Sequence, residues 1–408
     1  MKKSAVFLSS ALGLTLATSS FADNTTEELR ATIKSQQEAL KQLELRLDET
    51  EKRLEQTADA VDSSASKGSA TTIGGYGELH YNHITNDKDG TAKKEFDFHR
   101  FVLFFGHEFT ENTRFFSEVE LEHALSGDGK PGEVELEQAY VEHDVNNMFS
   151  TKAGVFLIPV GILNETHEPP TFYGVERNPV EKNIIPATWW EGGAAITVKP
   201  MGGLAFDAAI TSGLKTPTTG SNAYKIRKGR QKVANADGND LAYTLRVKYT
   251  AVPGLELAAT AQYQTDVTQN LQTLDIENED GTTETLTFEK APATLLSTHA
   301  IYNYEGFGLR ALYAQWNIEG AEAEAAGRNE QYGFYLEPSY RINDAFGVFA
   351  RYSKYDNTAG DKEDSKITQI NTGVNYWLHE NVVFKADYEI QGDTKDAQGF
   401  NLGVGYQF

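Results

Sequence analysis

The chain has 408 residues and carries 59 acidic against 37 basic side chains, which gives a formal net charge of −22. So acidic a chain repels nucleic-acid phosphates, and the complete lack of cysteine excludes a disulfide scaffold and thiolate metal sites. Both features suit a protein that is exported to an oxidising compartment.

Residues 1–22 have the order of a secretory signal peptide. Lys2 and Lys3 precede an apolar stretch from Ala5 to Leu16, and the small residues Ser20 and Ala22 follow. We therefore expect export with cleavage after Ala22.

Residues 23–61 predict a coiled coil. Seam positions recur alternately four and three residues apart, at Leu29, Ile33, Gln36, Leu40, Leu43, Leu47, Thr50, Leu54, Thr57 and Val61. This spacing is the a/d repeat of a left-handed coiled coil, and good helix formers fill the positions between. We favour self-association through this seam, with a single amphipathic helix as the alternative. Residues 62–72 are small and polar and predict a flexible linker.

Residues 73–408 predict sixteen antiparallel strands and no further helix. Apolar and polar side chains alternate, most clearly in the last strand, where Phe400, Leu402 and the terminal Phe408 share one face. Long connections, including 84–94 and 391–398, alternate with short turns such as 110–112. A soluble β-sandwich or propeller is the alternative. The aromatic ending and the unequal connections favour an all-β transmembrane barrel.

A barrel of sixteen strands leaves a water-filled lumen, so the inward side chains and any loop folded inward decide what passes. The connection 159–191 is long and contains Pro159, Pro169, Pro170, Pro179 and Pro186, which stiffen it. We expect it to constrict the pore rather than form an external lid. Its candidate site residues are Glu165, His167, Glu168, Glu176, Arg177 and Lys182.

Strand parity predicts which charges line the lumen. The expected inward charges are Arg100, Glu118, Glu120, Glu122, Arg246, Lys248, Arg310, Arg351 and Lys385, with the parity around Arg100 irregular from His99 to Phe105. Acidic and basic rows on different parts of the wall would create a transverse field. The simpler alternative is that these charges only hydrate the lumen.

Five cations gather in the connection 212–240, against the acidic background. They are Lys225, Arg227, Lys228, Arg230 and Lys232. They could collect anions at the pore mouth, bind lipopolysaccharide phosphates, or pair with acidic residues of the following loop.

Motifs of catalysis and metal binding are missing from the sequence. It has no Gly-x-Ser-x-Gly or P-loop motif, and no His/Glu pair at helical metal spacing. We expect no catalytic residue, cofactor or metal. A Ser/His pair on adjacent strands, as in a barrel hydrolase, stays open as an alternative.

Four segments resemble the phosphate-selective porin O and P family. They are Gly74-Gly75-Tyr76-Gly77-Glu78-Leu79, Phe98-His99-Arg100-Phe101, Val134-Glu135-Leu136-Glu137-Gln138-Ala139-Tyr140, and Gly154-Val155-Phe156-Leu157-Ile158-Pro159-Val160-Gly161 with the later Glu176-Arg177. The resemblance is continuous from about Ile73 to Phe408. It implies a trimer of sixteen-stranded barrels in the outer membrane, a constriction from the third loop, and passive uptake of small hydrophilic solutes such as phosphate. The family has a ladder of inward arginines, whereas this chain combines scattered cations with an acidic row.

Three functions are compatible with these features. The first is a general or weakly selective trimeric porin that contacts outer-membrane lipid and lipopolysaccharide, with its coiled coil in the periplasm. The second is an envelope tether whose coiled coil binds peptidoglycan. The third is an outer-membrane hydrolase, which would need a nucleophile beside a histidine.

Overall fold

The structure is a computed structural model that describes residues 70–408, apart from 129, 201, 271–272, 278–281 and 288. The predicted signal peptide, the predicted coiled coil and most of the predicted linker lie outside the described residues. The end of that linker belongs to the first strand instead, because Thr71 and Thr72 already pair with His107 and Gly106.

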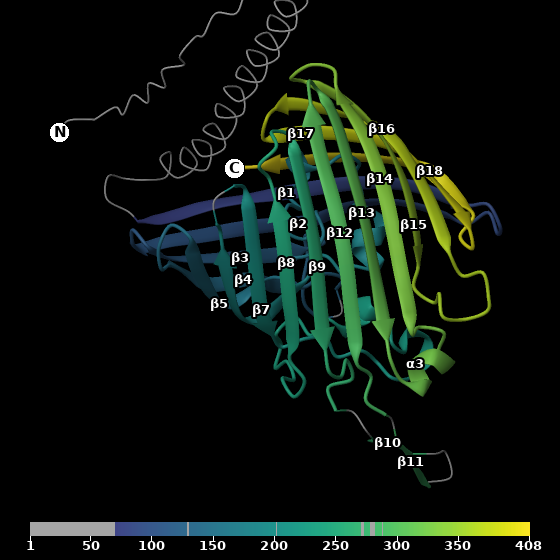
Figure 1. Ribbon diagram of the computed structural model, residues 1–408. Coiled ribbons are helices and arrows are strands. Elements are labelled where there is room, and N and C mark those ends of the chain that lie inside the picture. The colour runs from purple at the N-terminus through teal and green to yellow at the C-terminus, as the bar shows by residue number, and fades with distance from the viewer. Residues whose placement is uncertain (1–69, 129, 201, 271–272, 278–281, 288) are drawn as a thin grey trace, which may run out of the picture. The chain divides into compact units, whose positions relative to one another are not determined.

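Sixteen antiparallel strands close into a barrel (Figure 1), which confirms the predicted sixteen-stranded barrel. The strands are β1 (Thr71–Asn86), β2 (Ala92–Thr110), β3 (Thr113–Glu122), β4 (Val134–Asp144), β5 (Phe149–Leu157), β6 (Trp190–Val198), β7 (Leu204–Thr211), β8 (Ala242–Tyr249), β9 (Leu255–Gln264), β12 (Ala293–Tyr304), β13 (Phe307–Ile318), β14 (Glu330–Arg341), β15 (Phe346–Asp356), β16 (Ile367–His379), β17 (Val382–Asp393) and β18 (Ala397–Gln407). Closure joins β18 to β1, and Gly75 and Phe408 exchange two main-chain hydrogen bonds of 2.8 Å.

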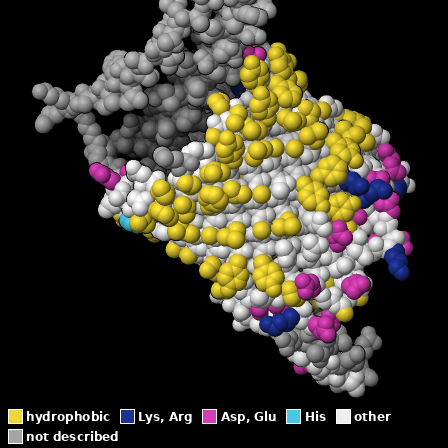
Figure 2. Space-filling view, in the orientation of Figure 1, with side chains coloured by type: hydrophobic (Ala, Val, Ile, Leu, Met, Phe, Trp, Pro, Cys, Tyr) yellow, Lys and Arg dark blue, Asp and Glu magenta, His cyan; other side chains and the backbone are white. Residues whose placement is uncertain are grey.

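The outer face of the barrel is apolar. Leu245 is 62% exposed and Leu402 is 46% exposed, although both are large hydrophobic side chains. Figure 2 shows such side chains spread over the outward faces of the strands, with charges gathered towards the end where the long loops emerge. No described helix is long and apolar enough to cross a membrane. An apolar belt of this extent needs lipid around it, which removes the soluble sandwich as an alternative.

The connections differ between the two ends of the barrel, but the first and the last are shorter than expected. The predicted long connections 84–94 and 391–398 shrink to 87–91 and 394–396, because β1, β2, β17 and β18 extend as hairpins beyond their predicted bounds. The prediction of no further helix is also wrong. Short helices α2 (Pro179–Asn183) and α3 (Ala321–Ala325) form in loops, together with three 3₁₀ turns at Pro169–Thr171, Gly220–Asn222 and Ile226–Gly229, and a hairpin of β10 (Thr273–Glu277) and β11 (Thr283–Thr287).

A hydrophobic core lies inside one side of the barrel. We call the connections that contribute to it loop 3 (158–189), loop 4 (212–241), loop 5 (265–292) and loop 6 (319–329). Their apolar side chains, among them Ile184, Leu214 and Tyr224, pack against inward residues of β12 to β15 such as Trp316 and Tyr335. Inward-folded loops therefore fill part of the lumen with ordinary protein core.

Candidate functional site

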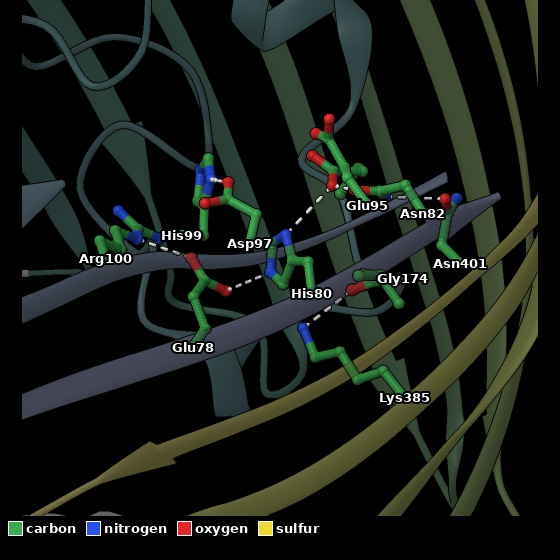
Figure 3. Close-up of polar contacts among 12 residues, drawn as sticks. Glu78, His80, Asn82, Glu95, Asp97, His99, Arg100, Gly174, Lys385 and Asn401 are labelled. Carbon is green, nitrogen blue, oxygen red and sulfur yellow. Dashed lines mark hydrogen bonds and ion pairs between the residues drawn. The ribbon is translucent and has the colours of Figure 1, made fainter. Parts of the chain in front are cut away.

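Loop 3 is held inside the barrel by cations of the wall. Four inward cations each donate to a main-chain carbonyl of the loop, namely Arg100 to His167 (2.8 Å), Arg310 to Thr171 (2.7 Å), Lys385 to Gly174 (2.9 Å) and Arg351 to Glu176 (3.3 Å). Figure 3 shows the contact of Lys385 with Gly174. Because these donors come from β2, β13, β15 and β17, the loop is tied to widely separated parts of the wall.

Acidic and polar wall residues complete the attachment of loop 3. The Asp387 carboxylate accepts from the Val175 amide at 2.7 Å. The Glu176 carboxylate accepts from Asn82 at 3.0 Å and contacts His80 at 3.1 Å, both on β1. On the far side of the lumen, Arg246 of β8 bonds to Glu165.

Glu181 fixes the two ends of loop 3 against each other. Asn178 caps α2 by accepting from the Glu181 amide at 2.8 Å, and Pro179 suits the first helical position. The Glu181 carboxylate then accepts from the amides of Ile162 and Leu163 at 2.8 and 2.6 Å. It also accepts from the Tyr335 hydroxyl of β14 at 2.9 Å. Burial raises the pKa of Glu181, which these hydrogen bonds oppose.

Gly161 belongs to the same arrangement. Its φ is +74°, and a Cβ at this position would lie 2.7 Å from Glu181 Oε2. Only glycine therefore allows the chain to turn this close to the carboxylate.

The acidic row of β3 faces the barrel interior but lies beneath loop 3. Glu118 is 1% exposed and Glu120 is 4% exposed, whereas Glu122 is half-buried. Glu118 contacts His167 at 3.3 Å and accepts from Gln138 at 2.6 Å. Burial alone would lower the pKa of His167, but the Glu118 carboxylate outweighs it and raises the pKa to about 9. A solute in the lumen therefore meets the loop rather than Glu118 and Glu120.

Loop 4 crosses the mouth of the barrel. At one end Lys232 bonds to Glu133 and Glu135 at the outer end of β4. At the other end the carbonyls of Ala223 and Tyr224 accept from Arg328 at 2.6 Å and from Gln331 of β14 at 2.8 Å. Since β14 is the eighth strand after β4 around the ring of sixteen, these attachments lie on opposite sides of the barrel.

Four cations from loops 3 and 4 form a group that we call the basic cluster, namely Arg177, Lys182, Arg227 and Arg230. Arg227 donates to the carbonyls of Lys182 at 2.7 Å and Ala187 at 3.0 Å. Arg230 donates to the Thr188 carbonyl, and Arg177 donates to the Thr188 hydroxyl at 2.7 Å. The Nε atoms of Arg177 and Arg230 are buried without a hydrogen-bond partner.

Carboxylates act on the basic cluster without pairing directly with it, and Arg230 is attracted by Glu135, Glu137 and Glu122. Within the part of the chain that the structure describes, none of its four members forms an ion pair. Burial, and then the neighbouring Arg230, lower the pKa of Arg227 to about 10. Burial also lowers the pKa of Lys182, although its side chain reaches solvent. The cluster is therefore a place where positive charges repel one another and an anion would be stabilised.

The remaining predicted site residues lie outside the basic cluster and outside the contacts that hold loop 3. Of the predicted mouth cluster, Lys228 is exposed, Lys225 is half-buried and Lys232 is paired with β4. Lys248 is half-buried near the inner end of β8, and Glu168 is half-buried on loop 3. The structure thus divides the predicted mouth cluster and brings Arg227 and Arg230 together with Arg177 and Lys182.

The sequence analysis missed a group of titratable side chains on the first three strands. Asp97 and His99 of β2 approach His123, which follows β3, and all three can present ligand atoms within 4.8 Å of one another. The available signal was the spacing of Asp97 and His99, because residues two apart share one face of a strand. A His/Glu pair at helical spacing, which the sequence lacks, would not reveal such a strand-borne group.

A closed sixteen-stranded barrel with an apolar belt and an inward-folded third loop defines a channel of the bacterial outer-membrane type. The model of the Gram-negative porin family matches residues 57–397, so the chain belongs to that family. Family and fold place it in the outer membrane and indicate a channel rather than an enzyme.

Several known proteins are similar to this chain. An uncharacterized protein of Aquifex aeolicus is 32% identical over 367 residues, which cover 83% of this chain and 80% of that protein. The anion-selective porin from Comamonas acidovorans superposes with a TM-score of 0.57 at 14% identity, covering 83% of this chain and all of that one. The trimer form of OmpT from Vibrio cholerae gives 0.54 at 13% identity, covering 83% and 100%. At these identities the solved structures show the fold alone.

Proposed function

We propose that the protein is a homotrimeric porin for the passive diffusion of small hydrophilic solutes, with a weak preference for anions such as phosphate. The observation that carries this proposal is the basic cluster. Its three arginines bond to carbonyl and hydroxyl oxygens, which leave their charge in place, and Lys182 reaches solvent, whereas Glu118 and Glu120 are buried beneath loop 3. Local charge beside the passage outweighs distant net charge, because screening at about 0.15 M salt acts within roughly 8 Å.

The resemblance to phosphate-selective porins and the fold shared with an anion-selective porin support the same direction. The trimer rests on the trimeric form of one structural neighbour and on the predicted coiled coil. The tether alternative has no described contact in its favour. Two hydroxyl–histidine pairs, Thr71 with His107 at 2.7 Å and Thr113 with His143 at 2.9 Å, have the contact that a hydrolase would need, but among the described residues no carboxylate bonds to either histidine to orient it.

Ion preference can be tested in planar bilayers. The reversal potential in a potassium chloride gradient should indicate preference for chloride, and phosphate should reduce the chloride current. Arg227→Gln with Arg230→Gln should move the reversal potential towards cations. Lys228→Gln is the matched control, because it removes one charge from an exposed position of the same loop. A cation-preferring wild-type channel, or an unchanged reversal potential in the double variant, would contradict the proposal.

A further inference from the structure

Asp97, His99 and His123 form a cluster at the outer end of the barrel that takes no part in holding loop 3. Asp97 Oδ2 lies 3.2 Å from His99 Nδ1, and Asp97 Oδ1 lies 2.7 Å from His123 Nδ1. The two imidazole rings are 6.0 Å apart and nearly perpendicular. Both δ nitrogens therefore face the same carboxylate.

An irregularity of the β1–β2 pairing lies beside His99. The register shifts between the pairs Glu78–Arg100 and His80–Asp97, which leaves one additional residue on β2. A bulge of this kind breaks the alternation of side chains, so that His99 and its neighbour Arg100 both reach the interior. This bulge is the physical reason for the irregular parity seen in the sequence around Arg100.

Neighbouring groups hold both histidines in place. The ring of His99 stacks on that of His80, with centroids 4.8 Å apart and planes 14° apart. His80 is itself fixed between Glu78 at 3.2 Å and Glu176 at 3.1 Å, and Figure 3 shows its contact with Glu78. His123 has φ of +54°, a conformation that residues other than glycine seldom adopt, and its amide donates to the His99 carbonyl at 3.3 Å.

The cluster is open to water, unlike a second histidine and carboxylate group in the barrel. The side chains of Asp97, His99 and His123 are 19%, 34% and 38% exposed. Glu118, Glu137 and His167 could also present three ligand atoms, but they are fully buried where loop 3 meets the wall, and they lie beside Arg100. An ion from solution can reach only the first group without displacing the loop.

We propose that Asp97, His99 and His123 bind one divalent transition-metal ion of the Zn²⁺, Co²⁺ or Ni²⁺ type at the outer mouth of the pore. Two imidazole nitrogens and one carboxylate oxygen are a donor set that suits these metals and not Mg²⁺ or Ca²⁺. Ligands about 2.0 to 2.1 Å from a tetrahedral ion stand about 3.3 Å apart. Asp97 Oδ2 and His99 Nδ1 already have this spacing at 3.2 Å, and the 2.7 Å hydrogen bond between Asp97 Oδ1 and His123 Nδ1 would lengthen when an ion replaces its proton. Glu95 and Glu122 act electrostatically on His123 and further favour a cation.

The probe for this site is the metal ion alone. Full-length protein without a histidine tag, washed with a chelator, is titrated with Zn²⁺ in an isothermal calorimeter, and we expect one saturable site per chain. His123→Ala and Asp97→Asn should each weaken binding by at least about 100-fold, since even loss of an outer-shell partner costs 10- to 100-fold. His143→Ala is the matched control, because His143 is exposed at the opposite end of the barrel. Co²⁺ should show the visible absorption of a low-coordinate imidazole complex in the wild type and not in His123→Ala.

Several results would contradict the proposed metal site. No saturable Zn²⁺ binding to the wild type would overturn the proposal, as would wild-type affinity in both His123→Ala and Asp97→Asn. Loss of the site in His143→Ala would place binding elsewhere. Heat-modifiable migration on gels identifies correctly folded variants, and Asp97→Asn preserves side-chain volume if His123→Ala fails this check.

Discussion

At the scale of single residues, the buried charged side chains of this barrel chiefly form hydrogen bonds between segments that are distant in the chain. The Glu181 carboxylate joins two amides at the start of loop 3 to a hydroxyl of β14. Arg351 joins β15 to the Glu176 carbonyl and to the Glu337 carboxylate at 3.1 Å. Hydrogen bonds to charged groups are the stronger kind, and a buried partner left unpaired is costly.

Glu181→Gln should loosen loop 3. The amide of glutamine presents one donor where the carboxylate has only acceptors, so one N–H or O–H of its partners loses its acceptor. We expect a local cost of about 1–3 kcal/mol. We expect faster proteolysis within loop 3 and a noisier single-channel current, and limited proteolysis and planar-bilayer recordings would measure these two effects. Glu168→Gln, at a half-buried position on the same loop, is the control, and equal behaviour of the two variants would argue against this role for Glu181.

The anion preference that we propose should fall as the pH rises towards 10. Burial lowers the pKa of Lys182 below the usual lysine value of about 10.4, so this cation loses its charge first. Burial and the neighbouring Arg230 also lower the pKa of Arg227, to about 10, so Arg227 begins to lose its charge only at the top of this range. Reversal potentials between about pH 7 and 10 measure the effect. Lys182→Arg should keep the anion preference at high pH, and a pH profile like that of the wild type would assign the titration to another group.

At the scale of elements, loops 3 and 4 decide how much of the barrel lumen stays open. Loop 3 is attached around the wall through Arg100, Arg310 and Lys385, and loop 4 crosses the mouth from β4 to β14. Where the two loops meet, Arg227 and Arg230 bind carbonyls of loop 3. Each loop therefore limits the movement of the other.

Deleting residues 165–176 should raise single-channel conductance markedly. The deletion removes the loop 3 carbonyls that accept from Arg100, Arg310 and Lys385, and it frees these cations to face the lumen. Planar-bilayer recordings measure the change. Removal of the exposed residues 361–364 of another outer loop is the control and should leave conductance nearly unchanged. Wild-type conductance in a folded variant lacking 165–176 would mean that loop 3 does not limit the current.

At the scale of the whole molecule, closure of the barrel removes every free strand edge among the sixteen strands. Satisfying all main-chain hydrogen bonds within the barrel is the condition for crossing lipid with strands. The apolar belt and the buried loop core then place hydrophobic side chains on both the outside and part of the inside.

Assembly and barrel stability should be separable. We expect a heat-modifiable trimer, and deletion of residues 23–66 should lower the trimer fraction without loss of channel activity, because β1 begins only at Thr71. Native mass spectrometry in mild detergent counts the subunits, and bilayer recordings check the channel. Monomers alone from the full chain would refute the trimer, and a deletion variant that keeps its full trimer fraction would refute the role of the coiled coil.

The sequence by itself determined the barrel, because the side chains of a strand alternate between the lipid and the lumen. The apolar or polar character of each side chain therefore indicates which side it faces. Leu245, Phe384 and Leu402 mark the lipid face, and the terminal Phe408 marks the closing strand. The apolar character of these residues is a local property, so it can be read without knowing which residues they contact. The inward cations could be found by the same parity, since Arg246, Arg351 and Lys385 stand opposite to apolar neighbours.

Only the tertiary structure decided what those inward residues do. His167 covers Glu118, which lies 49 positions earlier in the chain, and Arg351 reaches the Glu176 carbonyl across 175 positions. A bulge, which alternation cannot reveal, lets the adjacent residues His99 and Arg100 both face the interior. The physical reason is that a lumen side chain interacts with whichever loop folds over it, and the path of that loop depends on contacts all around the barrel wall.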